Sequence, residues 1–361
     1  MSRHKRFVLN LTRPSALGWA CLLTGMPLFA SSLFAQTKPA MAQVAPHIST
    51  SALPPIAPST RFAVLVGISD YPGTEEDLGG GPLNDVKLMA DLLVNKFGFD
   101  PSDILMLTDA QATKTNIHTA FVTFLAKAPE NGVVVFYFSG HGTQLPDDSG
   151  DEPDGLDETL VVLGDAPDTW AVIRDDELGW LAGLLPSRHI LIVLDNCYSG
   201  TGTRGIARTP SLATIAGGHA QSLQLASSAP SSERPRMAKR IPTDVFASLH
   251  SEAAAESHSI PASAPAPTTH LLLAAASEHE ESLNLPVRLD DGTEVRVGLF
   301  TAALYGQVNA SNLRTTTFTG LIADIGKTTR NTTAQLHEGP QTPQAEGVQQ
   351  GQTLSAFLQV P

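Results

Sequence analysis

The sequence has very little cysteine: among its 361 residues only Cys21 and Cys197 are of this type. Cys21 lies in an N-terminal segment that we expect to be removed, and its removal leaves Cys197 as the single cysteine. A single cysteine excludes an intramolecular disulfide and a metal centre built from several thiolates. The remaining cysteine is therefore either a buried core residue or a reactive thiol.

Other features are missing as well, namely a glycine-rich phosphate-binding loop, internal repeats and an excess of positive charge. The chain has 36 acidic residues against 23 Lys and Arg, which gives a net charge of −13. Loss of residues 1–42, which carry five basic and no acidic residues, makes this −13 − 5 = −18. So acidic a protein binds nucleic acid poorly and favours cationic substrates or divalent cations. We therefore expect no nucleic-acid partner.

The N-terminus has the layout of a secretory signal peptide. A basic region is followed by an apolar stretch from about Leu17 to Phe34 and then by small residues, which predicts cleavage after Ala42 or Ala35. The alternative is an uncleaved anchor, but the apolar stretch only marginally reaches the ~20 residues that a span needs. We expect an exported protein, periplasmic or secreted, with no stable membrane association after cleavage.

The rest of the chain alternates short aliphatic runs with helical patterns, which is typical of an α/β protein. Strands are expected at 62–68, 104–107, 133–138, 159–163, 190–194 and 270–275, with a hairpin around 288–295. Helices are expected at 84–97, 115–127, 175–185, 299–308 and 317–327. Two stretches rich in Ala, Ser and Pro interrupt this pattern: 43–60 is predicted to be a disordered lead-in, and 201–268 a flexible insertion apart from the core.

Two glycine-containing turns carry the chemistry. Ser139-Gly140-His141-Gly142 and Asp195-Asn196-Cys197-Tyr198-Ser199-Gly200 each follow an aliphatic run. Open α/β sheets bind their ligands at the carboxyl ends of such strands. A histidine and a cysteine on two such turns form the minimum constellation for catalysis by a thiol nucleophile. The alternative for Cys197 is a small residue of the core.

These turns, together with other short motifs in a fixed order, resemble the caspase–metacaspase family of cysteine peptidases, and its bacterial members above all. The resemblance extends from about residue 61 to about residue 355. It includes Leu83-Asn84-Asp85-Val86, Asp154-Gly155-Leu156-Asp157-Glu158, Asp175-Asp176-Glu177-Leu178, Gly298-Leu299-Phe300-Thr301 and Gln341-Thr342-Pro343-Gln344. The spacing 197 − 141 = 56 is close to the about 50 residues that separate the two groups in caspases.

The resemblance implies a caspase-like fold, with a central, mainly parallel sheet of about six strands and helices on both faces. It assigns residues 61–200 to a large-subunit portion and 269–361 to a small-subunit portion, joined by the insertion at 201–268. Family members often cut themselves at this junction, and here its basic residues are Arg204, Arg208, Arg234, Arg236, Lys239 and Arg240. We expect a monomer that acts on peptides or proteins and needs no organic cofactor.

The resemblance also assigns roles to single residues. Cys197 is the expected nucleophile, and His141 is its base and then the acid for the leaving amine. The N–H groups of Gly142 and Cys197 are expected to bind the oxyanion. Three further residues are expected to form an acidic pocket for a P1 Lys or Arg, namely Asp85, Ser139 and Asp195. Alternatively, Asp85 only favours a helix dipole and Asp195 only accepts backbone N–H groups.

The segment from Asp147 to Glu158 carries seven carboxylates, a set that is repulsive unless it is solvated or neutralised by a cation such as Ca²⁺. The resemblance singles out Asp157, Asp175 and Asp176 as calcium ligands. A further acidic ligand that the family has after the nucleophile is missing, since the sequence there is Gly202-Thr203-Arg204. A solvated acidic loop is the alternative.

The sequence therefore predicts a His141–Cys197 cysteine endopeptidase that cleaves after Arg or Lys through a thioester, with activation by Ca²⁺ and by self-cleavage within 201–268. One alternative is a catalytically idle scaffold or Ca²⁺-responsive interaction module with the same fold. Another is a thiol hydrolase with Asp or other specificity, against which Asp85 and Asp195 argue.

Overall fold

The computed structural model describes residues 59–71, 77–147, 150, 152, 154–197, 237–241, 270–288 and 294–360. The predicted signal peptide (1–42), nearly all of the lead-in and the insertion apart from 237–241 lie outside these residues. In the described part of the chain, no helix combines the length and apolarity that crossing a membrane requires.

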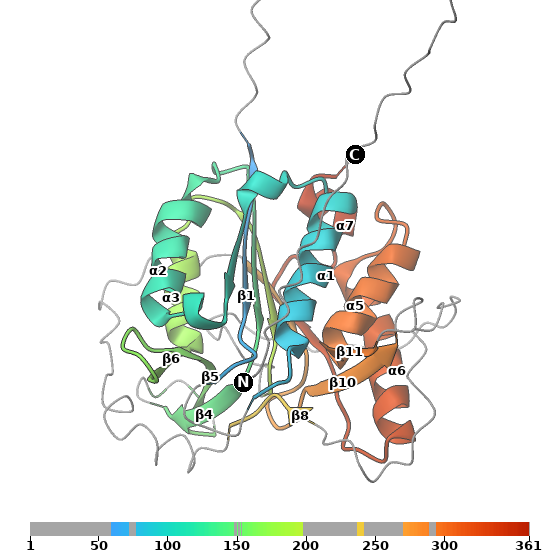
Figure 1. Cartoon of the computed structure of the whole chain (residues 1–361). Helices are drawn as coiled ribbons and strands as arrows, with labels where there is room; N and C mark the ends of the chain where they lie inside the picture. The colour runs from blue at the N-terminus through green and yellow to red at the C-terminus, as the bar shows by residue number, and fades with distance from the viewer. Residues whose placement is uncertain are drawn as a thin grey trace, which may run out of the picture. The chain divides into compact units, whose positions relative to one another are not determined.

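A six-stranded sheet forms the centre of the fold (Figure 1), as predicted. Its order is β12 (Gln344–Glu346), β9 (His270–Ala274), β7 (His189–Asp195), β3 (Val133–Ser139), β1 (Arg61–Gly67) and β2 (Ile104–Thr108). All neighbours are parallel except β12, which pairs antiparallel with β9. The prediction of a mainly parallel sheet is therefore confirmed.

Helices cover both faces of this sheet, also as predicted. One side carries α1 (Gly81–Asn95), α5 (Leu299–Ala310), α6 (Phe318–Gln335) and α7 (Leu354–Leu358), and the other α2 (Lys114–Thr119) and α3 (Asp175–Gly183). Alternate residues of a strand point to opposite faces. In β1, Ala63 and Leu65 accordingly belong to the apolar cluster under α1 and α5, whereas Val64 and Val66 belong to the cluster under α2 and α3.

All five predicted helices differ from the prediction in their bounds, and α6 extends furthest beyond it, to Gln335 instead of residue 327. Helix α1 begins at Gly81 rather than Asn84, because Gly80 takes the left-handed conformation (φ 82°) and Pro82 suits the first helical turn. Helix α2 ends at Thr119 and passes into a π-helical turn (Ala120–Phe124) and a 3₁₀ turn (Leu125–Lys127). Two more 3₁₀ turns flank β2, at Pro101–Asp103 and Asp109–Gln111.

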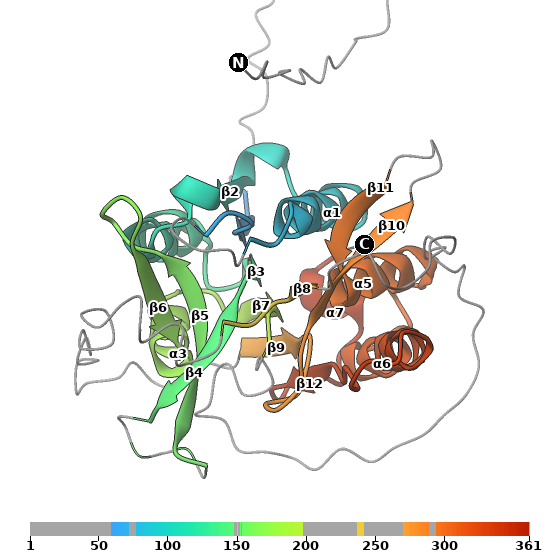
Figure 2. The same cartoon turned by 60° about the horizontal axis from the view of Figure 1, so that its bottom comes forward.

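Two three-stranded antiparallel sheets lie beside the central one (Figure 2). The first contains β4 (Gly142–Pro146), β5 (Leu156–Leu163) and β6 (Trp170–Arg174). The second contains β8 (Met237–Ala238), β10 (Leu283–Arg288) and β11 (Glu294–Gly298). The strand expected at 159–163 thus belongs to a side sheet. The predicted hairpin is present as β10 and β11, and its Asp-Gly turn lies outside the described residues.

The register of β3 and β7 brings their carboxyl ends level. Ser139 pairs with Asp195 across these parallel strands, and Ser139 also pairs with Gly67 at the end of β1. His141 and Cys197 each lie two residues beyond the first pair. The sheet therefore brings the two turns to the same edge.

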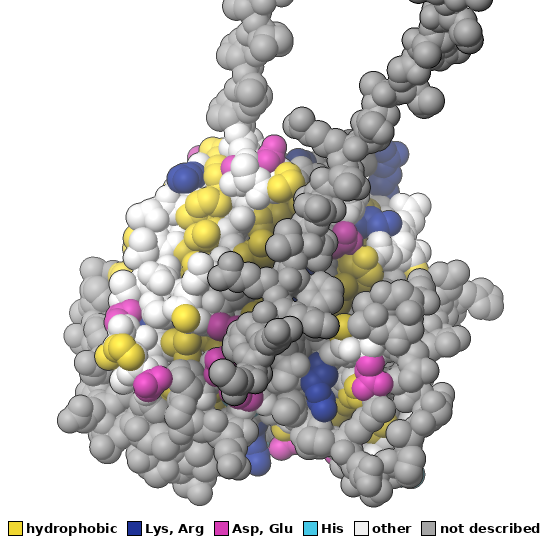
Figure 3. Space-filling model, in the orientation of Figure 1, with side chains coloured by type: hydrophobic (Ala, Val, Ile, Leu, Met, Phe, Trp, Pro, Cys, Tyr) yellow, Lys and Arg dark blue, Asp and Glu magenta, His cyan; other side chains and the backbone are white. Residues whose placement is uncertain are grey.

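Charged side chains are interspersed on the described part of the face shown in Figure 3, where acidic and basic groups alternate with hydrophobic ones. The buried charged residues are of greater interest, because a charge removed from water needs a partner or changes its protonation state. Asp85, Asp195 and Lys239 are all fully buried. They lie at the carboxyl edge of the sheet.

Candidate active site

The turns that carry His141 and Cys197 touch at this edge. A Cβ atom on Gly142 would overlap the Asn196 side chain and the Cys197 carbonyl oxygen, so only glycine allows the two turns to approach this closely. The exposed fraction of His141 is 1% and that of Cys197 is 0%. The two residues expected to be catalytic thus lie at the same edge of the sheet, and both are buried.

Tyr71 holds the histidine turn in place. Its hydroxyl accepts the His141 N–H (2.8 Å) and donates to the Val161 carbonyl (3.1 Å). Its ring packs on the imidazole, with 4.6 Å between the ring centroids. Burial raises the pKa of Tyr71 far above its ordinary value, so it acts as a neutral hydroxyl. No motif in the sequence pointed to this residue.

The Cys197 thiol lies against the backbone of Ser282. Its Sγ accepts the Ser282 N–H at 3.1 Å and lies 3.7 Å from the Ser282 carbonyl oxygen, to which it donates. Burial raises the pKa of the Cys197 thiol far above its ordinary value. In this arrangement the sulfur is a neutral thiol, and a thiolate requires a change around it.

Residues 237–241 lie directly over the two turns. The Lys239 carbonyl oxygen accepts N–H groups from both Gly142 (3.0 Å) and Cys197 (3.1 Å), the two donors expected to bind an oxyanion. The Lys239 N–H donates to the Ser282 carbonyl at 3.0 Å. The expectation that the whole stretch 201–268 lies apart from the core is wrong for these five residues, because Lys239 and Ile241 are fully buried.

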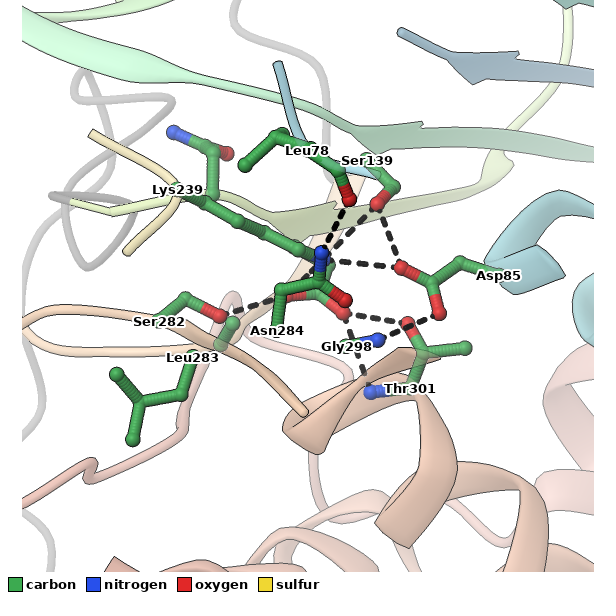
Figure 4. A network of polar contacts seen from close by, with 12 residues as sticks. Leu78, Asp85, Ser139, Lys239, Ser282, Leu283, Asn284, Gly298 and Thr301 are labelled. Carbon is green, nitrogen blue, oxygen red and sulfur yellow. Dashed lines mark hydrogen bonds and ion pairs between the residues drawn. The ribbon is translucent and has the colours of Figure 1, made fainter. Parts of the chain in front are cut away.

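Figure 4 shows Asp85 and Ser139 beside the Lys239 side chain, and Asp195, the third residue expected to form an acidic pocket, also contacts it. Its Nζ lies 2.9 Å from Asp85 Oδ2, 2.9 Å from Asp195 Oδ1 and 2.9 Å from Ser139 Oγ. An ammonium group has three N–H donors, and three oxygens surround this one. The pocket is therefore filled by a lysine of the same chain.

Backbone and hydroxyl groups hold the two carboxylates in position. Asp85 Oδ1 accepts the Gly298 N–H at 2.7 Å. Asp195 Oδ2 accepts the N–H and the hydroxyl of Thr301, at 3.2 and 2.6 Å, and its Oδ1 accepts the Ser282 hydroxyl at 2.7 Å. Both carboxylates thus keep a fixed geometry. The Gly298–Thr301 motif had been noted in the sequence but without a role.

The charges in the pocket depend on one another. Burial by itself lowers the pKa of Lys239, but the charges of Asp195 and Asp85 outweigh it and raise that pKa above its ordinary value. Burial raises the pKa of Asp85, and the Asp195 charge adds to this, while Lys239 opposes both. Two buried carboxylates so close together need a cation between them. The pocket is thus built for a positively charged side chain.

The acidic segment forms a second cluster, which differs from the predicted set. Carboxylate oxygens of Glu152, Glu158 and Asp175 lie within 4.8 Å of one another, and all three residues are buried. Burial raises the pKa of Glu158 to about 8 and that of Asp175 to about 9, with like charges nearby adding to the shift. The sequence predicts neither Glu152 nor Glu158 to be a calcium ligand, although both belong to the acidic run and Glu158 also to a family motif.

The three predicted calcium ligands have different surroundings in the structure. Asp175 belongs to this cluster, and its Oδ1 is buried without a hydrogen-bond partner among the described residues. Asp157 forms an ion pair with Arg174, so its carboxylate is already neutralised. Asp176 is half-buried, and its charge raises the pKa of Asp175. The ligand set Asp157, Asp175 and Asp176 is therefore not gathered as expected.

Comparison with known proteins gives a family match over most of the chain: the family described as "Caspase domain" matches residues 60–354. Among curated proteins, the chain is 38% identical to Metacaspase-2 of Arabidopsis thaliana over 156 residues, which are 41% of this chain and 36% of that protein. It is 36% identical to Metacaspase-1A of Aspergillus terreus over 176 residues, 44% of this chain and 42% of that protein. The chain thus matches about two fifths of these relatives' length.

Among solved structures, protein GSU0716 of Geobacter sulfurreducens is similar, with a TM-score of 0.50 and 20% sequence identity. The similarity covers 83% of this chain and 97% of that one. At this identity the likeness concerns the fold alone, which agrees with the six-stranded sheet and its two layers of helices.

The close approach of Gly298 to the pocket gives a test of the Lys239 contacts. A Cβ at this position would overlap Asp195 Oδ2 and Lys239 Nζ. We expect Gly298→Ala to expel Lys239 and to raise the alkylation rate of Cys197 at least ~10-fold, because the covering segment loosens. Mass spectrometry of the iodoacetamide-treated intact chain measures this. In Gly351→Ala, where a Cβ meets nothing within 4 Å, the rate is expected to stay unchanged. An unchanged rate in folded Gly298→Ala contradicts the arrangement.

The acidic cluster predicts a pH dependence of stability. Because burial raises the pKa values of Glu158 and Asp175 to about 8 and about 9, the folded state holds protons that the unfolded state releases near pH 4. With a chelator present, we expect the free energy of unfolding to fall as the pH rises from about 4 to about 9. Urea titrations measure it. Glu158→Gln should flatten the slope, whereas Glu130→Gln, an exposed residue paired with Arg188, should not. Equal slopes in all three proteins would disprove the burial effect.

Proposed function

The chain belongs to the caspase-domain family, and from this premise we propose that it is a cysteine endopeptidase that cleaves protein or peptide chains after lysine or arginine. The observation that carries the proposal is the position of Lys239. Its side chain fills a pocket of two buried carboxylates, and its carbonyl oxygen rests on the N–H groups of Gly142 and Cys197. This is the placement that a P1 residue of a substrate requires.

The chemistry follows from these positions. The Cys197 thiol loses its proton to the His141 imidazole, and the sulfur attacks the carbonyl carbon of the P1 residue. The N–H groups of Gly142 and Cys197 stabilise the negative charge that develops on the carbonyl oxygen. The C–N bond breaks, the amine leaves with the proton from His141, and a thioester remains. Water then hydrolyses the thioester, with the imidazole taking the proton from the water and the thiol being restored.

The preference for a basic P1 residue is supported by the negative charge that the pocket would carry without Lys239. Without a cation, Asp85 and Asp195 are two buried carboxylates that repel each other. The pKa of Asp85 is raised accordingly, first by burial and also, in the same direction, by the Asp195 charge. A substrate ammonium or guanidinium group removes this cost, whereas an aspartate would add a third negative charge. A P1 Asp is therefore expected to be rejected.

Self-cleavage is a further part of the proposal, and the bond we assign to it is Lys239–Arg240. Its carbonyl already lies on the two N–H donors, while His141 and Cys197 are covered. The uncut chain would accordingly be latent, since no other substrate can reach the thiol. The other basic residues of the insertion, from Arg204 to Arg236, lie outside the described residues.

Calcium binding is proposed for the acidic cluster, with a ligand set that differs from the expected one. Glu152, Glu158 and Asp175 supply closely spaced oxygens, the ligand type that Ca²⁺ prefers, and Asp175 Oδ1 has no other partner among the described residues. A bound cation would neutralise these carboxylates. Asp157 does not fit, because Arg174 already neutralises it.

Export to the periplasm or the exterior, and a monomeric state, are proposed on the sequence alone. The support for export is the order of basic, apolar and small residues within 1–42. A cysteine enzyme in such a compartment needs a thiol that does not pair with another, and Cys197 has no partner left in the chain once Cys21 is removed.

A second candidate, the idle scaffold, is favoured by one observation: the Cys197 thiol is buried, and this burial raises its pKa far above the ordinary value. If residues 237–241 never leave, no thiolate forms and the protein acts only through its surface. The two candidates differ in whether a substrate is turned over at all.

Turnover of short fluorogenic peptides with Lys, Arg or Asp at P1 tests the proposal, with Ca²⁺ and with a chelator. We expect Lys and Arg peptides to be cleaved at least ~100-fold faster than the Asp peptide, because the pocket requires a cation. Cys197→Ala should abolish turnover. Faster turnover with Ca²⁺ supports the cation site, and equal rates would remove calcium from the proposal.

Matched variants on α1 provide the control for specificity. Asp85→Asn should lower kcat/KM for the Lys peptide on the order of 100-fold, because it removes one of the two pocket charges. Asp91→Asn, on the exposed face of the same helix, should leave it unchanged. Equal cleavage of the Lys and Asp peptides would contradict the specificity. Absence of all cleavage by folded protein would favour the scaffold.

A further inference from the structure

The segment 237–241 continues past Lys239 into the other side of the site, and both halves are held by strands. On the N-terminal half, Met237 and Ala238 pair antiparallel with β10. On the C-terminal half, Arg240 forms a parallel bridge with Gly142 at the start of β4. In Figure 2, β8 accordingly lies between β10 and β4. A chain bound in this way contacts strands on both sides of the bond after Lys239.

The C-terminal half ends in a buried apolar position. The Ile241 N–H donates to the Gly142 carbonyl at 3.1 Å, which fixes the backbone. The Ile241 side chain has an exposed fraction of 0% and belongs to the same apolar cluster as Leu145 and Leu160 of β4 and β5. Sites that bind a ligand side chain are concave and mostly apolar, and the surroundings of Ile241 have this character.

The residue between Lys239 and Ile241 is more exposed than either of them. Arg240 is half-buried, and its guanidinium lies 3.6 Å from Glu281, with both side chains more than a third exposed. An ion pair in that setting contributes little, since water screens it. The structure thus distinguishes a partly exposed first position after the bond from a fully buried second one.

We propose that this peptidase has a second specificity subsite on the leaving side of the bond, which takes a large aliphatic residue at P2′. The proposal rests on the proposed function, and it names the substrate class more closely: chains with a basic P1 residue followed, two positions later, by Ile, Val or Leu. Burial of such a side chain in the apolar cluster that contains Ile241 provides the selectivity.

Internally quenched peptides with the sequence of residues 237–244 test the subsite, with Arg240 replaced by Gln so that only the bond after lysine can be cut. The peptides differ at the position of Ile241, where they carry Ile, Val, Gly or Asp. The purified chain is used as it stands after any cleavage of its own. We expect kcat/KM for Gly to be about 10- to 100-fold below that for Ile, with Val close to Ile and Asp lowest. The control restores arginine at the position after lysine and should change the rate of that cut by less than ~3-fold.

A short Lys fluorogenic peptide, which has no residue at P2′, separates the possible failures. If it is cleaved while the Ile and Gly peptides are turned over equally, the subsite is overturned and the proposed function stands. Cleavage of the short peptide but of none of the longer ones also overturns the subsite. If nothing is cleaved, the proposed function itself fails. Products are identified by mass, which places each cut.

In the whole chain, the same subsite should govern self-cleavage. Ile241→Val keeps the buried aliphatic group and should be cut like the original protein. Ile241→Ser should be cut at least ~10-fold more slowly, because its side chain cannot fill the apolar space. A Ser variant that is folded, as its thermal unfolding shows, and is cut at the original rate would contradict the inference.

Discussion

Two buried carboxylates that require a cation are the constraint on which the rest of this site depends. Asp85 comes from α1 and Asp195 from the end of β7, so helix and sheet meet at the pocket. Neither carboxylate is accessible to water, and Lys239 supplies the charge that both need. Because burying unpaired charges costs several kcal/mol, the pocket holds the Lys239 ammonium group tightly.

The remaining geometry follows from that anchor and from the sheet. The level ends of β3 and β7 bring the histidine turn and the cysteine turn together, and glycine at 142 lets them touch. Once Lys239 is in the pocket, its carbonyl falls on the N–H groups of both turns. A single arrangement thus accounts for cover and catalysis: the segment that hides Cys197 does so by lying as a substrate would. Under the proposed function, latency and specificity have the same physical origin.

The sequence predicted the sheet well because its strands are long aliphatic runs with glycine-containing turns behind them. The same logic placed His141 and Cys197 at one edge, and the family inferred from these turns is confirmed by the match over residues 60–354. The short strands β8 and β12, of two and three residues, carry no periodicity that could be detected. The sequence could not single out Lys239 as the residue in the pocket, because several other basic residues lie in the same low-complexity stretch.

The acidic loop shows a second limit of sequence reasoning. Asp157 and Asp175 looked equivalent along the chain, but pairing with Arg174 neutralises one and burial isolates the other. Which carboxylates gather depends on the antiparallel register of β4, β5 and β6, where Thr159 pairs with Arg174, and a run of acidic residues does not encode that register. Tyr71 and Ser282 likewise reach the site only through tertiary packing.

The central claim is that the chain holds its own Lys239–Arg240 bond as a substrate. The most direct test is the intact mass and the new N-terminus of the purified protein over time, with Cys197→Ala alongside. We expect one cut, with a fragment that begins at Arg240, and no cut in the Cys197→Ala protein. Cleavage elsewhere in the insertion while this bond stays whole, or the same cut in Cys197→Ala, would contradict it.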